Sequence, residues 1–341
     1  MVAEPATSKT PERSTTPERS SLIKSGGLFG NNVGDSIFYW GTMLFAASVL
    51  VVCLLIFLQL WKGALPSMHR FGIRFLYTRT WDPVQEVFGA LPFIYGTLVS
   101  SLLALLIAVP IGLGTAVFLS ELAPPWLRTP VSFLVELLAA VPSVVYGLWG
   151  IFVLVPALRP VEIWLGDRFG TIGGHDVVLF QGAPYGIGML AGGLILAIMI
   201  LPFITAVSRE VIRAVPPSQR EAAYGLGATH WEALKGPILR YARTGIMGAI
   251  ILGLARALGE TMAVTMVIGN SPNMSWSLFD QGYTLASVLA NEFAEATSDL
   301  YVSALIQLAL ILFGTTIVVN AIARLLIWSM VRNTQQGIVR E

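Results

Sequence analysis

Long apolar runs, separated by polar stretches, divide this chain into segments. Six of the runs are longer than 20 residues. Because an α-helix rises about 1.5 Å per residue, each run is long enough to cross a bilayer core of about 30 Å. The runs cover residues 37–60, 95–119, 131–155, 186–207, 245–268 and 300–322. The pattern predicts an all-α integral membrane protein with six transmembrane helices.

Prolines and closely spaced glycines occur inside these runs. Pro110, Pro142 and Pro202 each remove an intrahelical hydrogen bond, so we expect a kink at each position. Small residues let two membrane helices approach closely, and the glycines are therefore expected to serve helix packing. The pairs are Gly112 with Gly114, Gly188 with Gly192, and Gly245 with Gly248.

Composition agrees with a membrane protein. Hydrophobic residues make up 55% of the 341 residues and charged residues 12%, with a mean hydropathy of +0.72. A soluble domain carries about a quarter charged residues. The net charge of +1 supplies no basic stripe for nucleic acid, which excludes that class of partner. The single cysteine, Cys53, lies in an apolar run and can form no disulfide within the chain.

The polar stretches suggest the limits of further regions. Residues 1–36 are rich in Ser, Thr and Pro and are expected to be a disordered tail. The run 37–60 is longer than the core of a signal peptide, so we expect it to be retained as the first transmembrane helix. Residues 61–94 interleave aromatic and basic side chains, which is typical of an interfacial segment. A membrane-spanning core would then cover residues 95–328, followed by a tail at 329–341.

Basic residues set the expected orientation, because Lys and Arg concentrate in cytoplasmic loops. The connection at residues 209–243 carries six of them, whereas the loop at 269–299 carries none and holds four acidic residues. Both chain termini and the 209–243 connection are therefore expected in the cytoplasm. The basic residues of segment 61–94 argue the other way, but the two loops outweigh them and leave that segment extracytoplasmic.

Two capping-box patterns occur in the 209–243 connection. Ser218 precedes Glu221 by three residues, and Thr229 precedes Glu232 by three. They predict two short helices joined by a tight turn around Gly227, which should adopt a positive φ. Such helices are marginal alone, and their apolar side chains favour a protein partner, although a hairpin on the lipid headgroups is an alternative. These side chains are Ala222, Ala223, Tyr224, Leu226, Trp231 and Leu234.

Charged residues also occur inside the apolar runs. Arg256 lies near the centre of the fifth run, where an arginine costs about 2.5–3.5 kcal/mol to insert. Glu260 follows four residues later and should lie on the same helical face. The pair is either a structural lock or an oxyanion site in which Arg256 offers a planar donor fork. Glu136, early in the third run, lines the path or lies at the headgroups; its position in the sequence leaves both open.

Several motifs in this chain resemble those of known protein families. Glu221-Ala222-Ala223 with Gly227 resembles the EAA loop of ABC importer permeases, although Leu239-Arg240 stands where that family commonly has Leu-Pro. The stretches 256–264 (RALGETMAV) and 136–147 (ELLAAVPSVVYG) resemble the PstC family of permease subunits of phosphate-specific ABC importers. The similarity runs from about residue 71 to residue 328.

The resemblance implies a type I permease of the prokaryotic cytoplasmic membrane that moves inorganic phosphate at the expense of ATP hydrolysed by another subunit. It implies as partners a PstA-like permease, two ATPase subunits, an extracytoplasmic phosphate-binding protein and the surrounding membrane lipid. ATP and magnesium are then expected on the ATPase, with no cofactor on this chain. Arg256 and Glu260, with Glu136 as a further candidate, are the expected substrate-path residues. The expected ATPase-coupling residues are Glu221, Ala222, Ala223, Gly225, Gly227 and Trp231.

Other functions stay open from the residues alone. Spacing does not distinguish phosphate from sulfate, molybdate or nitrate, so a permease for another oxyanion is an alternative. A membrane phosphoester enzyme is less favoured, because the chain has no phosphate loop of the type that binds ATP and its three histidines lie in separate loops. A secondary carrier would often show two related halves, and we find no such repeat.

Overall fold

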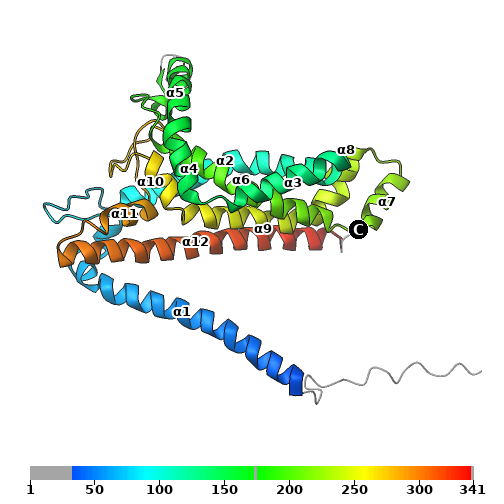
Figure 1. Cartoon of the computed structure of the whole chain (residues 1–341), viewed down its shortest axis with the longest axis horizontal. Helices are drawn as coiled ribbons and strands as arrows, with labels where there is room; N and C mark the ends of the chain where they lie inside the picture. The colour runs from blue at the N-terminus through cyan, green and yellow to red at the C-terminus, as the bar shows by residue number, and fades with distance from the viewer. Residues whose placement is uncertain (1–32, 173–174, 339–341) are drawn as a thin grey trace, which may run out of the picture. The chain divides into compact units, whose positions relative to one another are not determined.

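The computed structural model describes residues 33–172 and 175–338, and within them the chain is mostly helical (Figure 1). The longer helices are α1 (Val33–Phe71), α2 (Leu91–Val117), α3 (Pro125–Ala140), α5 (Val155–Phe169), α6 (Met189–Arg213), α9 (Leu239–Leu258) and α12 (Asp299–Ile338). The shorter ones are α4 (Ser143–Trp149), α7 (Pro217–Gly225), α8 (His230–Ala233), α10 (Met262–Val267) and α11 (Leu285–Glu292).

Single turns and one small ribbon complete the described elements. Three-ten turns are η1 (Gly72–Leu76) and η4 (Val178–Phe180), and π-helical turns are η2 (Phe118–Leu122), η3 (Gly150–Leu154) and η5 (Leu234–Ile238). The strands β1 (Thr171–Ile172) and β2 (His175–Asp176) pair antiparallel, with Thr171 opposite Asp176.

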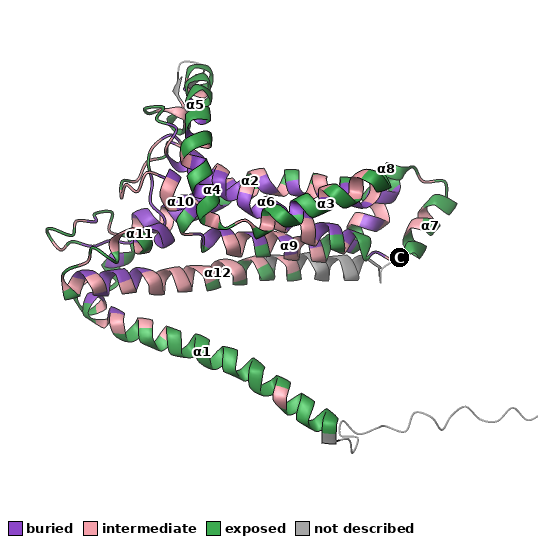
Figure 2. Cartoon of the chain, in the orientation of Figure 1, coloured by how far each residue is buried: buried purple, intermediate pink, exposed green. Residues whose placement is uncertain are grey.

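The described residues fall into two units, one ending at Ile56 and one beginning at Phe57. In the first unit α1 begins at Val33, four residues before the predicted start of the span. Its apolar side chains are almost all exposed, as Figure 2 shows in green. Such a helix is suited to a lipid environment. The expected disordered tail lies mostly outside the described residues, and its last four residues belong to α1.

Six helices of the described chain are long and apolar enough to cross a membrane, which confirms the predicted number. Three of the predicted spans correspond closely to helices, the first lies within the longer α1, and the third and the fifth do not correspond to one helix. The observed spans are Gly34–Leu76, Leu91–Leu122, Ser143–Phe169, Met189–Arg213, His230–Leu258 and Asp299–Leu325.

The predicted third span, 131–155, is wrong because the chain leaves the helix in its middle. Helix α3 ends at Ala140, Val141 and Pro142 are extended, and α4 begins at Ser143. The proline disfavours a helical conformation of the residue before it. Pro142 thus breaks the helix rather than kinking it, whereas Pro110 and Pro202 lie inside α2 and α6 as expected.

The segment 61–94, predicted to be interfacial, packs in part against the protein. Helix α1 continues through it to Phe71, and the chain then folds back so that Phe75, Trp81 and Phe88 are buried. The Phe88 ring stacks on Tyr301 of α12 at 5.4 Å between centroids. The rings therefore pack against the protein, because aromatic partners from distant parts of the sequence offer them more contact than a surface does.

Helix α6 is the centre of the second unit. Buried residues make up 61% of its most apolar window, against 28% for the spans of α2, α9 and α12. It packs along α2 and α9, and its buried Ile195, Ile200 and Ile204 belong to the largest apolar cluster. Side chains on α6 are therefore placed by neighbours on both sides.

Candidate functional site

Within the 209–243 connection, α7 and α8 fold back on each other. We call residues 217–233 the hairpin. One predicted capping box is confirmed: the Thr229 backbone N–H donates to Glu232 Oε2 at 2.8 Å, and the Glu232 N–H donates to Thr229 Oγ1 at 3.3 Å. The other is wrong. Helix α7 begins at Pro217 with Pro216 at its cap position, so Ser218 already lies inside the helix. The ring of Pro217 fixes a helical φ at the first position without a side-chain cap.

The turn of the hairpin has the predicted backbone. Gly227 adopts a φ of +83°, a conformation that residues with a side chain rarely adopt. A Cβ at this position would meet nothing within 4 Å, so a substitution would strain the backbone without a clash. Gly225 is the last residue of α7. The turn therefore requires glycine at position 227 for conformational reasons alone.

The hairpin exposes apolar side chains. Leu226 is 90% exposed, Trp231 66% and Tyr224 41%. Glu221 and Ala222 are exposed beside them and Ala223 is half-buried. Leu234, expected at the surface, is buried because it packs with Ala116 and Ile212 in an apolar cluster below the hairpin. The hairpin is suited to covering by another protein, since exposed apolar side chains gathered on one short element are typical of an interaction site.

The second candidate region surrounds Arg256 in the last turn of α9. Its guanidinium lies 4.7 Å from the centre of the Phe203 ring on α6, a cation–π geometry. The side chain is half-buried, and its Nε is buried with no hydrogen-bond partner. Within the described chain, no carboxylate forms an ion pair with Arg256.

Glu260 is not on the helical face of Arg256, and that prediction is wrong. Helix α9 ends at Leu258, and a break precedes α10, which begins at Met262. Glu260 lies in this break, 9% exposed, and its Oε1 accepts from the Ala263 N–H at 3.3 Å. The carboxylate therefore satisfies a free amide at the start of α10, where helix N–H groups favour a negative charge.

Glu136 is distant from Arg256. Its Oε1 accepts from Arg209 Nη2 of α6 at 3.0 Å, and Glu210 accepts from the same nitrogen at 2.8 Å. Arg209 is 8% exposed, so this triad satisfies a buried charge. Arg209 lies six residues along α6 from Phe203, or about 9 Å along the helix axis. The structure thus brings Glu136 to the hairpin end of α6, away from Arg256.

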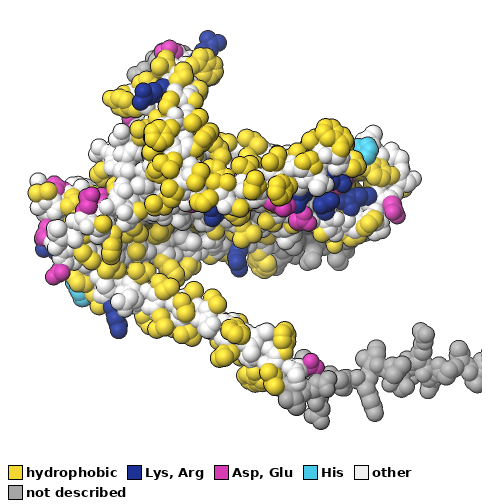
Figure 3. All heavy atoms as spheres, in the orientation of Figure 1, with side chains coloured by type: hydrophobic (Ala, Val, Ile, Leu, Met, Phe, Trp, Pro, Cys, Tyr) yellow, Lys and Arg dark blue, Asp and Glu magenta, His cyan; other side chains and the backbone are white. Residues whose placement is uncertain are grey.

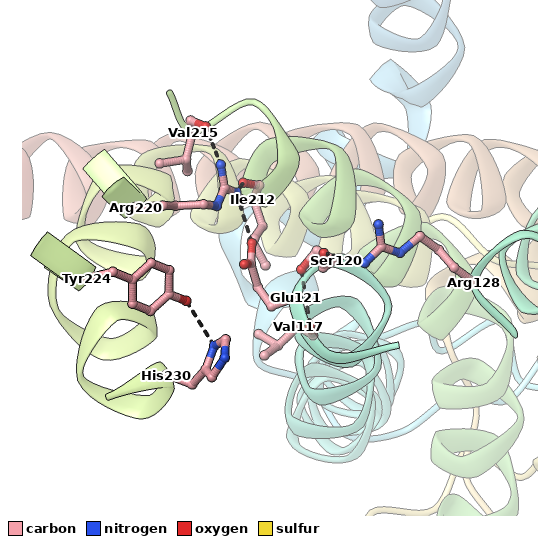
Figure 4. A network of polar contacts seen from close by, with 9 residues as sticks. All are labelled: Val117, Ser120, Glu121, Arg128, Ile212, Val215, Arg220, Tyr224 and His230. Carbon is pink, nitrogen blue, oxygen red and sulfur yellow. Dashed lines mark hydrogen bonds and ion pairs between the residues drawn. The ribbon is translucent and has the colours of Figure 1, made fainter. Parts of the chain in front are cut away.

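A third set of charges holds the hairpin to the bundle (Figure 4). Arg220 Nη2 of α7 donates to Glu121 Oε1 in η2 at 2.9 Å. The Tyr224 hydroxyl and His230 Nδ1 lie 2.9 Å apart and join α7 to α8. Figure 3 shows Lys, Arg, Asp and Glu side chains gathered around this end of the bundle, between long apolar flanks.

Sequence reasoning missed Phe203, Arg209, the Glu121–Arg220 pair and Glu162. No spacing rule relates Phe203 to Arg256, because the two lie on different helices. Glu162 is recognisable from the sequence as a candidate, because it is a carboxylate in a mostly apolar stretch. It is fully buried in α5, where its Oε2 accepts from the Gly186 N–H at 2.8 Å.

Comparison with known proteins agrees with this geometry. Residues 108–331 match the family described as "Binding-protein-dependent transport system inner membrane component". A "Phosphate transport system permease protein PstC" of Mesorhizobium japonicum is 50% identical over 293 residues, covering 85% of this chain and 89% of that protein. The protein of the same name from Haemophilus influenzae is 47% identical over 310 residues, covering 91% and 98%.

Solved structures share the fold at low identity. A bacterial ABC transporter for import of the acidic polysaccharide alginate gives a TM-score of 0.52 at 16% identity, covering 85% of this chain and 98% of that one. The MetNI methionine ABC transporter, in inward-facing conformations, gives 0.51 at 17% identity, covering 72% and 98%. The fold is that of an ABC importer permease. The chain belongs to the family of binding-protein-dependent transport system inner membrane components, and these relatives at about half identity are PstC proteins.

Proposed function

We propose that this chain is a permease subunit of an ABC importer that carries inorganic phosphate across the cytoplasmic membrane, with Arg256 as a transient ligand of the anion. The observation that carries the proposal is the half-buried guanidinium of Arg256, which lies against an aromatic ring and has no carboxylate partner in the described chain. A planar guanidinium can donate two parallel hydrogen bonds to an oxyanion.

The contrast with Arg209 supports this role. Two carboxylates neutralise Arg209, so it has little capacity left for an anion. Phe203 stabilises the charge of Arg256 without accepting the fork of hydrogen bonds that an oxyanion would accept. Glu260, close in the sequence, is the proposed acceptor for the proton of a partly protonated phosphate. Glu136 stays a candidate for the hairpin end of the path.

The remaining subunits complete the proposal. A PstA-like permease forms a heterodimer with this chain, and an extracytoplasmic phosphate-binding protein delivers the anion. The exposed apolar face of the hairpin, with Leu226 and Trp231, docks on an ATPase subunit that holds ATP and magnesium. Both termini of this chain and the hairpin then lie in the cytoplasm, in agreement with the basic residues of the 209–243 connection. This chain itself catalyses no reaction.

Replacing Arg256 with lysine tests the ligand role. Lysine keeps the charge but offers a single ammonium instead of the two parallel donors of a guanidinium. Losing one charged hydrogen bond costs about 1.5–3 kcal/mol. Uptake of phosphate by vesicles that contain the full transporter should therefore fall roughly ten- to a hundredfold. Uptake is normalised to the amount of assembled complex. Arg243→Lys, an exposed arginine on the same helix, is the matched control and should transport normally.

A double variant separates transport from structure. If Arg256 and Glu260 only stabilise the fold, Arg256→Leu with Glu260→Leu should lower the amount of assembled complex and keep the uptake per assembled complex. An assembled but inactive double variant supports a role of both residues in the substrate path.

Two further measurements test the alternative functions. Competition with sulfate, molybdate and nitrate in the same assay tests a permease for another oxyanion. Phosphoester turnover by the purified subunit would favour an enzyme.

A further inference from the structure

Helix α7 has few contacts with the rest of the described chain. It buries no side chain, whereas α8 and η5 insert Ala233, Leu234 and Ile238 into the protein. The Tyr224 hydroxyl links α7 only to the neighbouring α8. Arg220, in the second turn of α7, is the described side chain of this helix that bonds to the membrane helices (Figure 4). A displacement of α7 is therefore transmitted through Arg220 or through α8 and η5, which pack against α7.

Three acceptors hold the Arg220 guanidinium. Nη2 donates to Glu121 Oε1 and to the Ile212 carbonyl, each at 2.9 Å, and Nη1 donates to the Val215 carbonyl at 2.6 Å. The side chains of Arg220 and Glu121 are 22% and 16% exposed, so water screens this ion pair little. A guanidinium bonded at both ends of its fork has one orientation, and the contact is stiff.

Glu121 connects this contact to the bundle. It lies in η2, the π-helical turn that ends the span of α2. Single π-helical turns within helices are common at functional sites, because the extra residue leaves the local ladder less regular. Helix α2 packs along α6, which carries Phe203 against Arg256. The contact from α7 thus continues through packed helices towards the proposed anion ligand.

We propose that the Arg220–Glu121 pair is the positioning link through which a displacement of α7 reaches α2, so that ATP hydrolysis on the partner drives the membrane helices. The link rests on the proposed function, since α7 must first dock on an ATPase. Arg220 itself contacts neither phosphate nor ATP. Its loss should leave the ATPase bound and hydrolysing, while less of each hydrolysis event reaches the transport path.

The test uses the full transporter in vesicles, with its ATPase, its second permease and its binding protein. ATP hydrolysis and phosphate uptake are measured together in Arg220→Gln, Glu121→Gln and the double variant. We expect the number of phosphates imported per ATP to fall on the order of tenfold in each single variant, the factor that matches one charged hydrogen bond. The double variant should fall no further, because both residues act through one contact.

Two further variants make the result specific. Arg128 caps the carbonyls of Ser120 and Ala123 near the same turn without contacting the hairpin, so Arg128→Gln is the matched control and should keep the ratio. Arg220→Lys keeps the charge and should give an intermediate ratio. The ratio is independent of how much complex assembles, which separates a loss of transmission from a loss of folding.

The outcomes distinguish the two proposals. A ratio that stays native in Arg220→Gln and Glu121→Gln, or losses that add in the double variant, would overturn the link alone. A native transporter in which ATP hydrolysis drives no phosphate uptake would overturn the proposed function and the link with it. A low ratio in both single variants, with ATPase still bound and Arg128→Gln unaffected, supports the link.

Discussion

Arg209 and Arg256 are both arginines within the bundle, and their surroundings assign them different roles. Arg209 is buried between Glu136 and Glu210, so its charge is satisfied by the fold. Arg256 faces an aromatic ring and forms no ion pair with a carboxylate in the described chain, whereas the Nε of both arginines is buried without a partner. An arginine without a carboxylate partner keeps its donor fork for an oxyanion. The residue type alone does not tell whether an arginine stabilises the fold or binds an anion.

Phe203 provides the first prediction at this scale. Replacing Phe203 with leucine removes the ring beneath Arg256 and keeps most of the apolar volume. A cation–π contact contributes about 0.5–2 kcal/mol, so phosphate uptake should fall roughly two- to thirtyfold. Phe203→Tyr and Phe203→Trp keep a ring and should restore transport, as measured by uptake per assembled complex.

A control on an exposed ring isolates the effect of the cation–π contact. Phe133 on α3 is 63% exposed, and Phe133→Leu should transport normally. Equal uptake by Phe203→Leu and the native chain would show that the ring does not position Arg256. Equal losses of phosphate uptake in Phe203→Leu and Phe203→Tyr would show that the packing of Phe203, and not its cation–π contact with Arg256, supports transport.

Element boundaries follow from local chemistry in some places and from tertiary contacts in others. The turn at Gly227 and the box of Thr229 with Glu232 form as predicted, because each involves residues that are close in the sequence. The break at Pro142 has a local cause too, yet whether a proline kinks or breaks a membrane helix depends on what satisfies the freed groups. Pro202 remains inside α6, which is packed along most of its length.

The loop between α1 and α2 supplies a prediction at the element scale. Glu292 at the end of α11 accepts from Trp81 Nε1 and from the Tyr301 hydroxyl, each at 2.7 Å. Burial raises the pKa of Glu292, and the two hydrogen bonds oppose that rise only in part. A carboxyl with a raised pKa binds its proton more tightly in the folded than in the unfolded state. Its contribution to stability is therefore lost as the pH rises from its ordinary pKa through the raised one.

Hydrogen exchange of residues 77–91, measured in the full transporter upward from about pH 4.5, checks this sign. Protection, corrected for the intrinsic exchange rate, should decrease as the pH rises in the native chain and stay level in Glu292→Gln. The charge of Glu295 adds to the rise in the pKa of Glu292, so Glu295→Gln should move the decrease to lower pH. A decrease that persists unchanged in Glu292→Gln would contradict the assignment.

At the scale of the whole molecule, the packing of α6 against its neighbours organises the second unit. Glycines were expected to bring helices together, but in two of the three predicted pairs only one member lies against a neighbouring helix. A Cβ on Gly245 of α9 would lie 2.4 Å from Val211 Cγ1 of α6, whereas one on Gly248 would meet nothing within 4 Å. Likewise Gly112 faces Ile204 and Gly114 faces open space. Spacing identifies candidate positions, and the neighbouring helix decides which one is in contact.

Gly245→Ala and Gly248→Ala form a matched pair of variants on one helix. Gly245→Ala must push α6 and α9 apart and should destabilise the assembled transporter by about 1–3 kcal/mol, the usual range for overpacking. Gly248→Ala should be neutral or stabilise by up to about 1 kcal/mol, because alanine favours the helix. Thermal unfolding of the purified complex measures both. If Gly248→Ala were the more harmful change, position 248 would face a partner subunit instead.

The amino-acid sequence alone predicts the helical class, the number of spans, the hairpin and the positive φ of Gly227. These features depend on hydrophobic length and on neighbours within a few residues, which the sequence displays directly. The motifs around Glu221 and Arg256 also indicated the family that the comparisons then showed.

The three-dimensional fold sets which side chains meet. It placed Phe203 rather than Glu260 on Arg256, paired Glu136 with Arg209, and joined Arg220 to Glu121. It also buried Phe75, Trp81 and Phe88, three aromatic rings of the segment that the sequence predicts to be interfacial. Each of these contacts joins elements far apart in the chain, and its geometry depends on how two helices pack. No periodicity within one segment encodes that packing, because it is a property of both surfaces together.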